Sequence, residues 1–256
     1  MKREWLGRRV WLTGASSGIG AAVARKLAAQ GAKLILSGRN RSALEALGCG
    51  EVLPFDIRQP SAWKEAATQV QKLGGIDDFL HCAGDCQYVD GRDYRAAPYR
   101  EVMETNFLSV AEGLVEVLPL LRQGRQARLI LVSSCAPWFA FPRASAYNAS
   151  KAALTSFGRC LRADLAAEGL QVCLIHPGFV HTPLTAKNDF PMPFAISAED
   201  AAERIDCGLR KGRSELEFPK RFTWSLRFLS CLPQSLQDRI SAKLVKPLNA
   251  NSQAAK

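Results

Sequence analysis

Histidine and methionine are scarce in this chain of 256 residues, which contains three of each. Its eight cysteines are scattered and include no CxxC pair. No set of histidines and cysteines therefore has the spacing of a zinc site, and we expect no bound metal. Scattered cysteines without a signal-peptide pattern are typical of reduced thiols, so we expect a cytoplasmic protein. No apolar run reaches the length of a transmembrane helix.

Acidic residues are outnumbered, with 24 Asp and Glu against 34 Lys and Arg, which gives a net charge of +10. A basic balance can attract nucleic acid, an anionic membrane or an anionic ligand. No nucleic-acid-binding module is recognisable in the sequence, so we interpret the charge as a solvated surface and expect no nucleic-acid partner. The hydrophobic fraction of 47% is sufficient for a large core.

Short aliphatic or β-branched runs alternate with longer helical patterns. The expected strands are residues 9–13, 33–37, 51–55, 78–82, 128–133, 172–176 and 215–218, and the expected helices are residues 19–30, 61–73, 98–121, 147–168 and 198–210. This alternation predicts an α/β doubly wound parallel sheet, a Rossmann fold, with helices on both faces. We expect one domain over residues 1–219 and a basic, amphipathic helical extension over residues 220–256.

A glycine-rich loop joins the first expected strand to the first expected helix. Its glycines are Gly14, Gly18 and Gly20. Glycine is required where a backbone turns tightly or approaches a phosphate closely, and the N–H groups at the start of the helix attract a pyrophosphate. A strand, a glycine loop and a helix in this order predict a dinucleotide site. The other loop residues that we expect to contact the nucleotide are Ser16, Ser17 and Ile19.

The second expected strand lacks the acidic residue with which NAD-binding proteins usually hold the ribose 2′-hydroxyl. The strand ends at Ser37 and is followed by Gly38 and Arg39. A guanidinium can pair with the 2′-phosphate of NADP and stack on its adenine. We therefore predict NADP(H) as the cofactor and Arg39 as one of its ligands. The alternative is that Arg39 is a solvated loop residue.

Tyr147 and Lys151 are four residues apart on one face of an expected helix. A tyrosine that exchanges protons near neutral pH needs help, because its ordinary pKa is about 10. A neighbouring ammonium stabilises the phenolate, so we expect Lys151 to lower the pKa of Tyr147. Ser133 and the adjacent Ser134 lie at the end of the preceding strand.

The TGxxxGxG loop and the YxxxK pair resemble the short-chain dehydrogenase/reductase superfamily, in the right order and over most of the chain. The resemblance implies a catalytic set of Asn106, Ser134, Tyr147 and Lys151. Ser134 and Tyr147 would polarise a carbonyl, the nicotinamide would deliver hydride, Tyr147 would exchange the proton, and Lys151 with Asn106 would complete a proton relay. Asn106, Tyr147 and Lys151 would also contact the cofactor.

The same resemblance implies further contacts with the cofactor. Asp56 and Ile57 would meet the adenine ring. His81 and Cys82 stand where the family usually has two asparagines, while Ala83 and Gly84 keep the small residues that lie under the cofactor. Cys82 remains in the expected cofactor set, although we interpret Cys82 and Cys86 as buried thiols. The residues expected near the nicotinamide and phosphates are Pro177, Gly178, Val180 and Thr182.

Residues 183–197 occupy the position of the family's substrate loop, and their Phe190, Met192 and Phe194 suggest a hydrophobic substrate or, equally, packing on the core. In the extension, Phe222, Leu226 and Leu229 share a helical face, continued by Leu236, Ile240 and Leu244. We expect this face to pack on the domain or on a second subunit. Peripheral binding to an anionic membrane is the less favoured alternative.

The sequence therefore predicts an NADP(H)-dependent oxidoreductase that acts on a carbonyl or a secondary alcohol, with a small-molecule substrate. The alternatives are a non-catalytic NADP(H)-sensing protein on the same fold and a membrane-surface protein that acts through its tail. The resemblance implies a homodimer or homotetramer formed by residues 98–121 and 147–168. The apolar residues available for that contact are Leu108, Leu114, Phe157 and Leu161.

Overall fold

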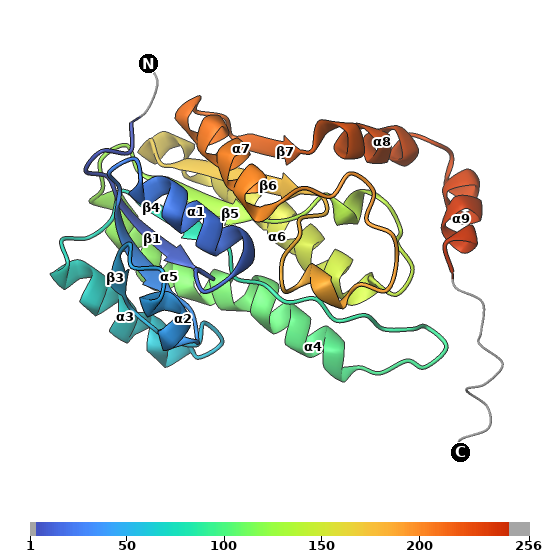
Figure 1. The fold of residues 1–256 in the computed structure, drawn as a ribbon, viewed down its shortest axis with the longest axis horizontal. Coiled ribbons are helices and arrows are strands. Elements are labelled where there is room, and N and C mark those ends of the chain that lie inside the picture. Colours follow the sequence, from blue (N-terminus) through green and yellow to red (C-terminus); the bar gives the residue numbers. More distant parts are fainter. Residues whose placement is uncertain (1–3, 246–256) are drawn as a thin grey trace.

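The computed structural model describes residues 4–245, in which seven parallel strands form one sheet in the order β3-β2-β1-β4-β5-β6-β7 (Figure 1). The strands are β1 (Arg9–Thr13), β2 (Lys33–Ser37), β3 (Glu51–Val52), β4 (Asp78–His81), β5 (Arg128–Val132), β6 (Gln171–Pro177) and β7 (Glu215–Phe218). The strand order reverses between β1 and β4, and β1 pairs in parallel with β2 on one side and with β4 on the other. This reversal opens a crevice at the carboxyl ends of the strands, where α/β sheets bind ligands.

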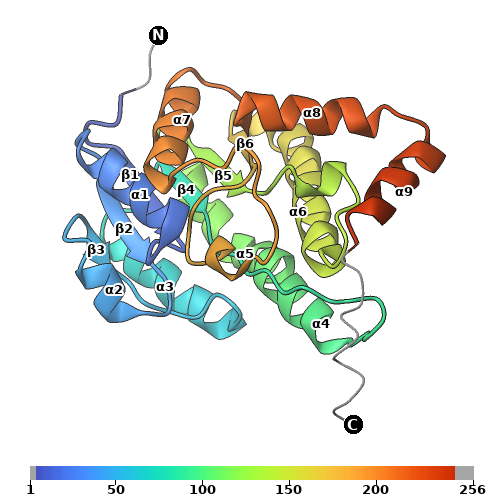
Figure 2. The same ribbon diagram turned by 45° about the vertical axis from the view of Figure 1, so that its right-hand side comes forward.

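Helices cover both faces of the sheet, as the sequence predicted. They are α1 (Gly18–Ala28), α2 (Arg41–Glu45), α3 (Pro60–Lys72), α4 (Ala97–Met103), α5 (Ser109–Arg122), α6 (Ser145–Asp164), α7 (Ala198–Arg210), α8 (Lys220–Ser230) and α9 (Gln234–Lys243). Helices α1 and α7 pack together on one face, and α3, α5 and α6 cover the other (Figures 1 and 2). The doubly wound fold is thereby confirmed.

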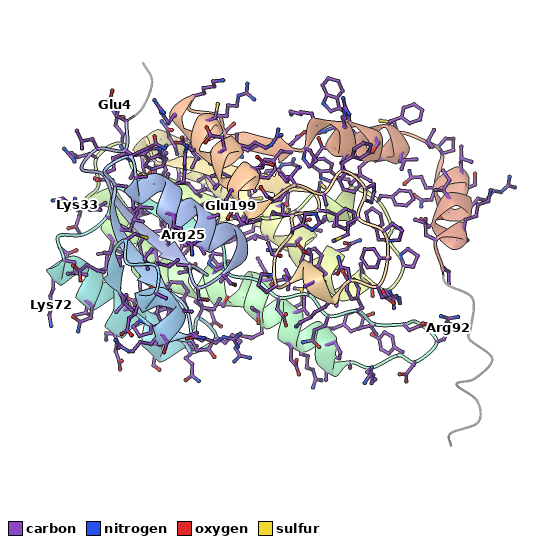
Figure 3. All side chains as sticks on the ribbon, viewed as in Figure 1. Glu4, Arg25, Lys33, Lys72, Arg92 and Glu199 are labelled. Atoms are coloured by element: carbon purple, nitrogen blue, oxygen red, sulfur yellow. The ribbon has the colours of Figure 1, made fainter. Side chains whose placement is uncertain are left out.

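Large aromatic side chains fill the layer between the sheet and α3. The ring of Trp11 lies 5.8 Å from that of Trp63 and 5.3 Å from that of Phe79, in edge-on contacts. The Trp63 ring also lies against α5, where a Cβ on Gly113 would come within 2.6 Å of it. The core is therefore closely packed here, and the shapes of the side chains as well as the buried apolar area determine which residues fit. Charged side chains such as those labelled in Figure 3 lie on the surface.

Two predicted elements differ from the structure. Strand β3 ends at Val52 instead of residue 55, although Leu53 and Phe55 still donate hydrogen bonds to the carbonyls of Leu36 and Gly38. The helix expected over residues 98–121 is interrupted by a π-helical segment, η1 (Glu104–Leu108). Such insertions are often found at functional sites, and this one carries Asn106.

The extension forms α8 and α9 at the side of the molecule away from α2 and α3 (Figure 2). Phe222 and Leu226 of α8 are buried in a cluster with Cys135 and Phe139, and Leu229 and Ile240 pack against this cluster. Leu236 and Leu244 are exposed, so the apolar face predicted from the sequence ends within α9. The boundary after residue 219 stays a prediction. Among residues 4–245, no helix is long and apolar enough to cross a bilayer.

Candidate active site

A cavity of about 470 Å³ opens at the carboxyl ends of the strands. Its walls come from the loops that follow β1, β2, β4, β5 and β6 and from the start of α6. Every residue expected to bind the cofactor lines it except Asn106. Residues of the cavity wall that the motifs did not indicate include Phe55, Arg58, Asp85, Glu101, Thr105, Leu184, Thr185 and Lys187.

The glycine loop approaches its neighbours at backbone distance. Gly14 has a φ of +74°, and a Cβ there would lie 2.4 Å from the backbone nitrogen of Ala83. No side chain larger than hydrogen fits between these two segments. At the start of α1, the Ser17 side chain makes no capping hydrogen bond. The first N–H groups of this helix, which begins at the cavity wall, are thus left for an anion such as a pyrophosphate.

The end of the cavity near β2 is basic. The Ser37 hydroxyl is buried and accepts a hydrogen bond of 2.9 Å from Nε1 of Trp11, so it faces the core instead of the cavity. Arg39 is exposed on the cavity wall. Asp56 forms an ion pair of 2.7 Å with Arg58, and the guanidinium lowers the pKa of this carboxyl. The donor set fits a nucleotide phosphate at this end.

Ser134, and not Ser133, is the hydroxyl that meets Tyr147. The Ser133 hydroxyl donates to the Lys151 carbonyl at 2.9 Å and lies 2.7 Å from Oγ1 of Thr155, which holds it against α6. The Ser134 hydroxyl is hydrogen-bonded to Tyr147 and accepts from the Ala136 amide at 3.0 Å. The choice of Ser134 that the resemblance implies therefore agrees with the geometry.

The pKa of Tyr147 is raised above its ordinary value, because burial disfavours the phenolate. The hydrogen bond from Ser134 opposes this effect. Nζ of Lys151 lies 5.9 Å from the centre of the Tyr147 ring and donates a 3.0 Å hydrogen bond to the carbonyl of Val132. Burial outweighs any stabilisation of the phenolate by Lys151, so the expected net lowering of the Tyr147 pKa is wrong. Near neutral pH, Tyr147 is a protonated phenol.

Burial also lowers the pKa of Lys151, to about 8, while the nearby thiols of Cys82 and Cys86 oppose the shift. The ammonium is therefore only partly protonated a little above neutral pH. The pKa of the Cys82 and Cys86 thiols is about 11, raised by burial. Both cysteines are neutral thiols around the lysine, and no group of residues within 4–245 has the arrangement of a metal site.

Asn106 is fully buried and is not among the residues that line the cavity, so its contact with the cofactor stays a prediction. Its amide nitrogen donates to the carbonyl of Asp85 and to the hydroxyl of Ser150, both at 2.9 Å, and its Oδ1 accepts from the Asp85 amide at 2.7 Å. The interrupted helix η1 places this side chain between α6 and the segment after β4. Asn106 thus joins the two segments that carry Lys151 and Gly84.

His81 replaces the first asparagine of the related pattern and has a structural contact. Its Nδ1 lies 2.9 Å from Oγ1 of Thr13 on the neighbouring strand β1, and the ring is fully buried. Burial, with a further contribution from Lys151, lowers the pKa of His81 to about 3, so the ring is neutral. His176 is also buried, with Nδ1 3.3 Å from the Ser134 carbonyl, in agreement with its interpretation as structural.

The loop of residues 183–197 is held in place by contacts with Tyr88 and Arg143, which no sequence motif indicated. The hydroxyl of Tyr88 donates to Oδ1 of Asn188 at 2.7 Å, and Arg143 forms an ion pair with Asp189. The Tyr88 ring meets Phe190 edge-on at 5.6 Å between ring centres. Burial raises the pKa of Tyr88, and Tyr147 contributes to this shift. Tyr88 and Arg143 are far from residues 188–190 in the sequence, so only the folded chain brings them together.

Comparisons with known proteins agree with this architecture. A model of the short chain dehydrogenase family matches residues 8–191. An uncharacterized oxidoreductase of Myxococcus xanthus is 33% identical over 246 residues, which cover 93% of this chain and 97% of its own. Dehydrogenase/reductase SDR family member 7B of Mus musculus is 32% identical over 222 residues, which cover 81% of this chain and 67% of its own.

Solved structures show the same fold at lower identity. A short chain dehydrogenase from Burkholderia cenocepacia, determined in complex with NADP, has a TM-score of 0.82 at 23% identity, over 96% of this chain and 100% of its own. A second structure, that of gox2181, has a TM-score of 0.76 at 19% identity, over 84% of this chain and 95% of its own.

Proposed function

This chain belongs to the short-chain dehydrogenase family of oxidoreductases, and we propose that it transfers a hydride between NADP(H) and a carbonyl or secondary-alcohol carbon. The observation that carries the proposal is the hydrogen-bonded pair of Ser134 and Tyr147 on the wall of the nucleotide-sized cavity. A protein that only sensed the nucleotide would have no need of a phenol and a hydroxyl directed at one point.

NADP(H) fits the donor set of the cavity. The amino end of α1 would hold the pyrophosphate, and Arg39 would pair with the 2′-phosphate. Because the Ser37 side chain faces Trp11, no acidic or hydroxyl group at that strand end competes for the ribose. The related structure from Burkholderia cenocepacia contains NADP, which supports the same choice here. When bound, the nicotinamide supplies or accepts the hydride.

The chain's own residues would hold and protonate the substrate oxygen. Ser134 would donate a hydrogen bond to it, and Tyr147, a protonated phenol near neutral pH, would give up its proton as negative charge develops. This protonation state suits reduction of a carbonyl. Lys151, partly charged near its pKa of about 8, would stabilise the phenolate that remains.

Asn106 would act as a positioning residue in this scheme, because its hydrogen bonds hold Asp85 and Ser150 and do not reach Lys151. A Cβ on Gly84 would lie 3.3 Å from both Oδ1 of Asn106 and Nζ of Lys151. The two groups therefore lie on the same side of Gly84, and loss of the amide would free the Asp85 and Ser150 segments that flank the lysine. Pro183 and Leu184 of the loop 183–197 line the cavity, and Phe190 of the same loop packs against Tyr88, so we expect this loop to meet the apolar part of a substrate.

The proposal is tested with Tyr147→Phe on a panel of aldehydes, ketones and secondary alcohols, followed by NADPH absorbance. This variant keeps the ring and removes the hydroxyl. We expect turnover to fall by about 10²- to 10⁴-fold, the usual contribution of a positioned acid. NADPH affinity, measured by fluorescence titration, should be unchanged. Turnover close to that of the wild type would contradict the mechanism, and tight NADPH binding without turnover of any panel member would favour the sensing alternative.

A further inference from the structure

Helix α8 has two apolar faces, and only one of them is covered. On the inner face, Phe222 and Leu226 are buried, and the ring of Phe222 lies 5.1 Å from that of Phe179. On the outer face, Trp224 and Phe228 have 66% and 69% of their surface exposed. These two rings are four residues apart and so lie next to each other on the helix. They form an aromatic surface that nothing in residues 4–245 covers.

Cationic side chains lie on the same helix as these two rings. Arg221 precedes Trp224 by three residues and shares its face. Lys220 and Arg227, which flank that face, are both paired with Glu217 of β7. Arg221 forms no ion pair with any residue in the described part of the chain.

Helix α9 also exposes apolar and cationic side chains. It exposes Leu236, with Leu244 directly after it, and it carries Arg239 and Lys243, which have no acidic partner within residues 4–245. Asp238 is the single acidic residue of α8 and α9, and its carboxylate accepts a hydrogen bond from Gln234. The outer surface of the two helices is therefore aromatic, aliphatic and cationic.

We propose that the outer face of α8, with α9, binds the surface of a membrane that contains anionic phospholipids. Tryptophan and phenylalanine rings partition into the headgroup region of a bilayer, and nearby cations are attracted to an anionic leaflet. A second copy of the chain fits this face less well. In a two-fold contact each patch meets itself, which would bring Arg221 and Arg239 against the same cations with almost no acid to offset them.

Helix α8 packs on the domain with one face and exposes the other. The inner face of α8 is buried against the chain's own domain, as its spacing indicated. Because the helix is anchored on that side, its outer face is presented in a fixed orientation, and no unfolding is needed for contact with lipid. The proposed membrane contact and the packing on the domain thus use opposite faces of α8.

The test uses the full-length protein and sedimentation with vesicles of phosphatidylcholine alone or mixed with phosphatidylserine. We expect binding to the anionic vesicles at low salt and release at high salt, because charges are screened over about 10 Å at 0.1 M. Trp224→Ala/Phe228→Ala should reduce partitioning at least tenfold. Tyr94→Ala is the matched control, since this aromatic residue is also exposed, at 65%, but lies in the loop before α4.

Trp224 also reports the contact directly. Trp5, Trp11 and Trp63 are buried and Trp138 is partly buried, so a lipid-induced blue shift of emission, quenched by brominated lipid, should come from Trp224. It should vanish in Trp224→Phe, whose vesicle binding should persist. Unchanged binding by the double variant, or no binding of the wild type to anionic vesicles, would refute the proposal. So would a change of oligomeric state in the double variant without any effect of lipid.

Discussion

Lys151 is the group of the site whose titration lies nearest neutral pH. Its pKa is about 8, whereas that of His81 is about 3 and those of Cys82 and Cys86 are about 11. A depressed lysine pKa means that the charged form is present below about pH 8 and is lost above it. If the ammonium assists Tyr147, carbonyl reduction should fall as the pH rises through about 8.

The substitution Lys151→Arg tests whether this lysine causes the fall of the reduction rate near pH 8. Lys151→Arg keeps the positive charge at all accessible pH values, because the guanidinium pKa exceeds 12. Whatever its absolute rate, this variant should lack the fall near pH 8 in a profile of kcat/KM. Persistence of the same fall in Lys151→Arg would show that another group causes it, and the phenol is an unsuitable candidate because burial raises its pKa.

Arg39 is the residue that should decide between the two nicotinamide nucleotides. Removing its guanidinium leaves the 2′-phosphate of NADPH without its main partner, whereas NADH, which has no phosphate there, would lose only the stacking contact with its adenine. Arg39→Ala should therefore weaken NADPH binding at least tenfold, about 1.4 kcal/mol, with little effect on NADH. Lys33→Ala, a cation lost from the opposite end of β2, serves as the control. Equal affinity of the wild type for both nucleotides, by fluorescence titration, would refute this assignment.

At the scale of elements, the loop of residues 183–197 depends on contacts between distant segments. Tyr88→Phe removes the hydrogen bond to Asn188 and keeps the ring against Phe190. One such bond contributes about 0.5–1.5 kcal/mol, so we expect KM for a bulky carbonyl substrate to rise roughly 2- to 10-fold with kcat nearly unchanged. Tyr99→Phe, which loses a hydroxyl bonded at 2.7 Å to Ser145, is the control. An equal rise of KM in both variants would contradict a specific role for the loop contact.

The elements also show what the sequence could and could not predict. The glycine loop and the pair of Tyr147 and Lys151 were recognisable because their chemistry depends on spacing within one turn or one helix. The π-helical segment at Asn106 was not, since one extra residue per turn leaves the apolar pattern on either side unchanged. The partners of Tyr88 were not either, because they meet only through tertiary contacts. The direction of the Tyr147 pKa shift required knowledge of burial.

At the scale of the whole molecule, the predicted subunit contact must be revised in detail. Of the four apolar residues expected at it, Leu114 is 3% exposed and belongs to the core, while Phe157 and Leu161 are partly buried. Leu108 remains exposed, and Val115, which the sequence interpretation omitted, is 71% exposed. Leu108 and Val115 are seven residues apart and lie on one outward face of η1 and α5. This face, next to α6, is where we place the contact.

We predict a homodimer or homotetramer that Val115→Arg dissociates. In a two-fold contact through this face each Val115 would lie near its own copy, so the substitution would bury two guanidinium groups of like charge, at a cost of several kcal/mol. Sedimentation velocity at micromolar concentration should show a multimer for the wild type and a monomer for the variant. Leu73→Arg, a change of the same kind at an exposed position after α3, should leave the wild-type assembly intact. A monomeric wild type, or a Val115→Arg protein that sediments like the wild type, would place the contact elsewhere or remove it. Because the Val115 side chain is 71% exposed, the substitution should disturb the fold of the single subunit little. The melting temperature should therefore depend on protein concentration in the wild type but not in the monomeric variant.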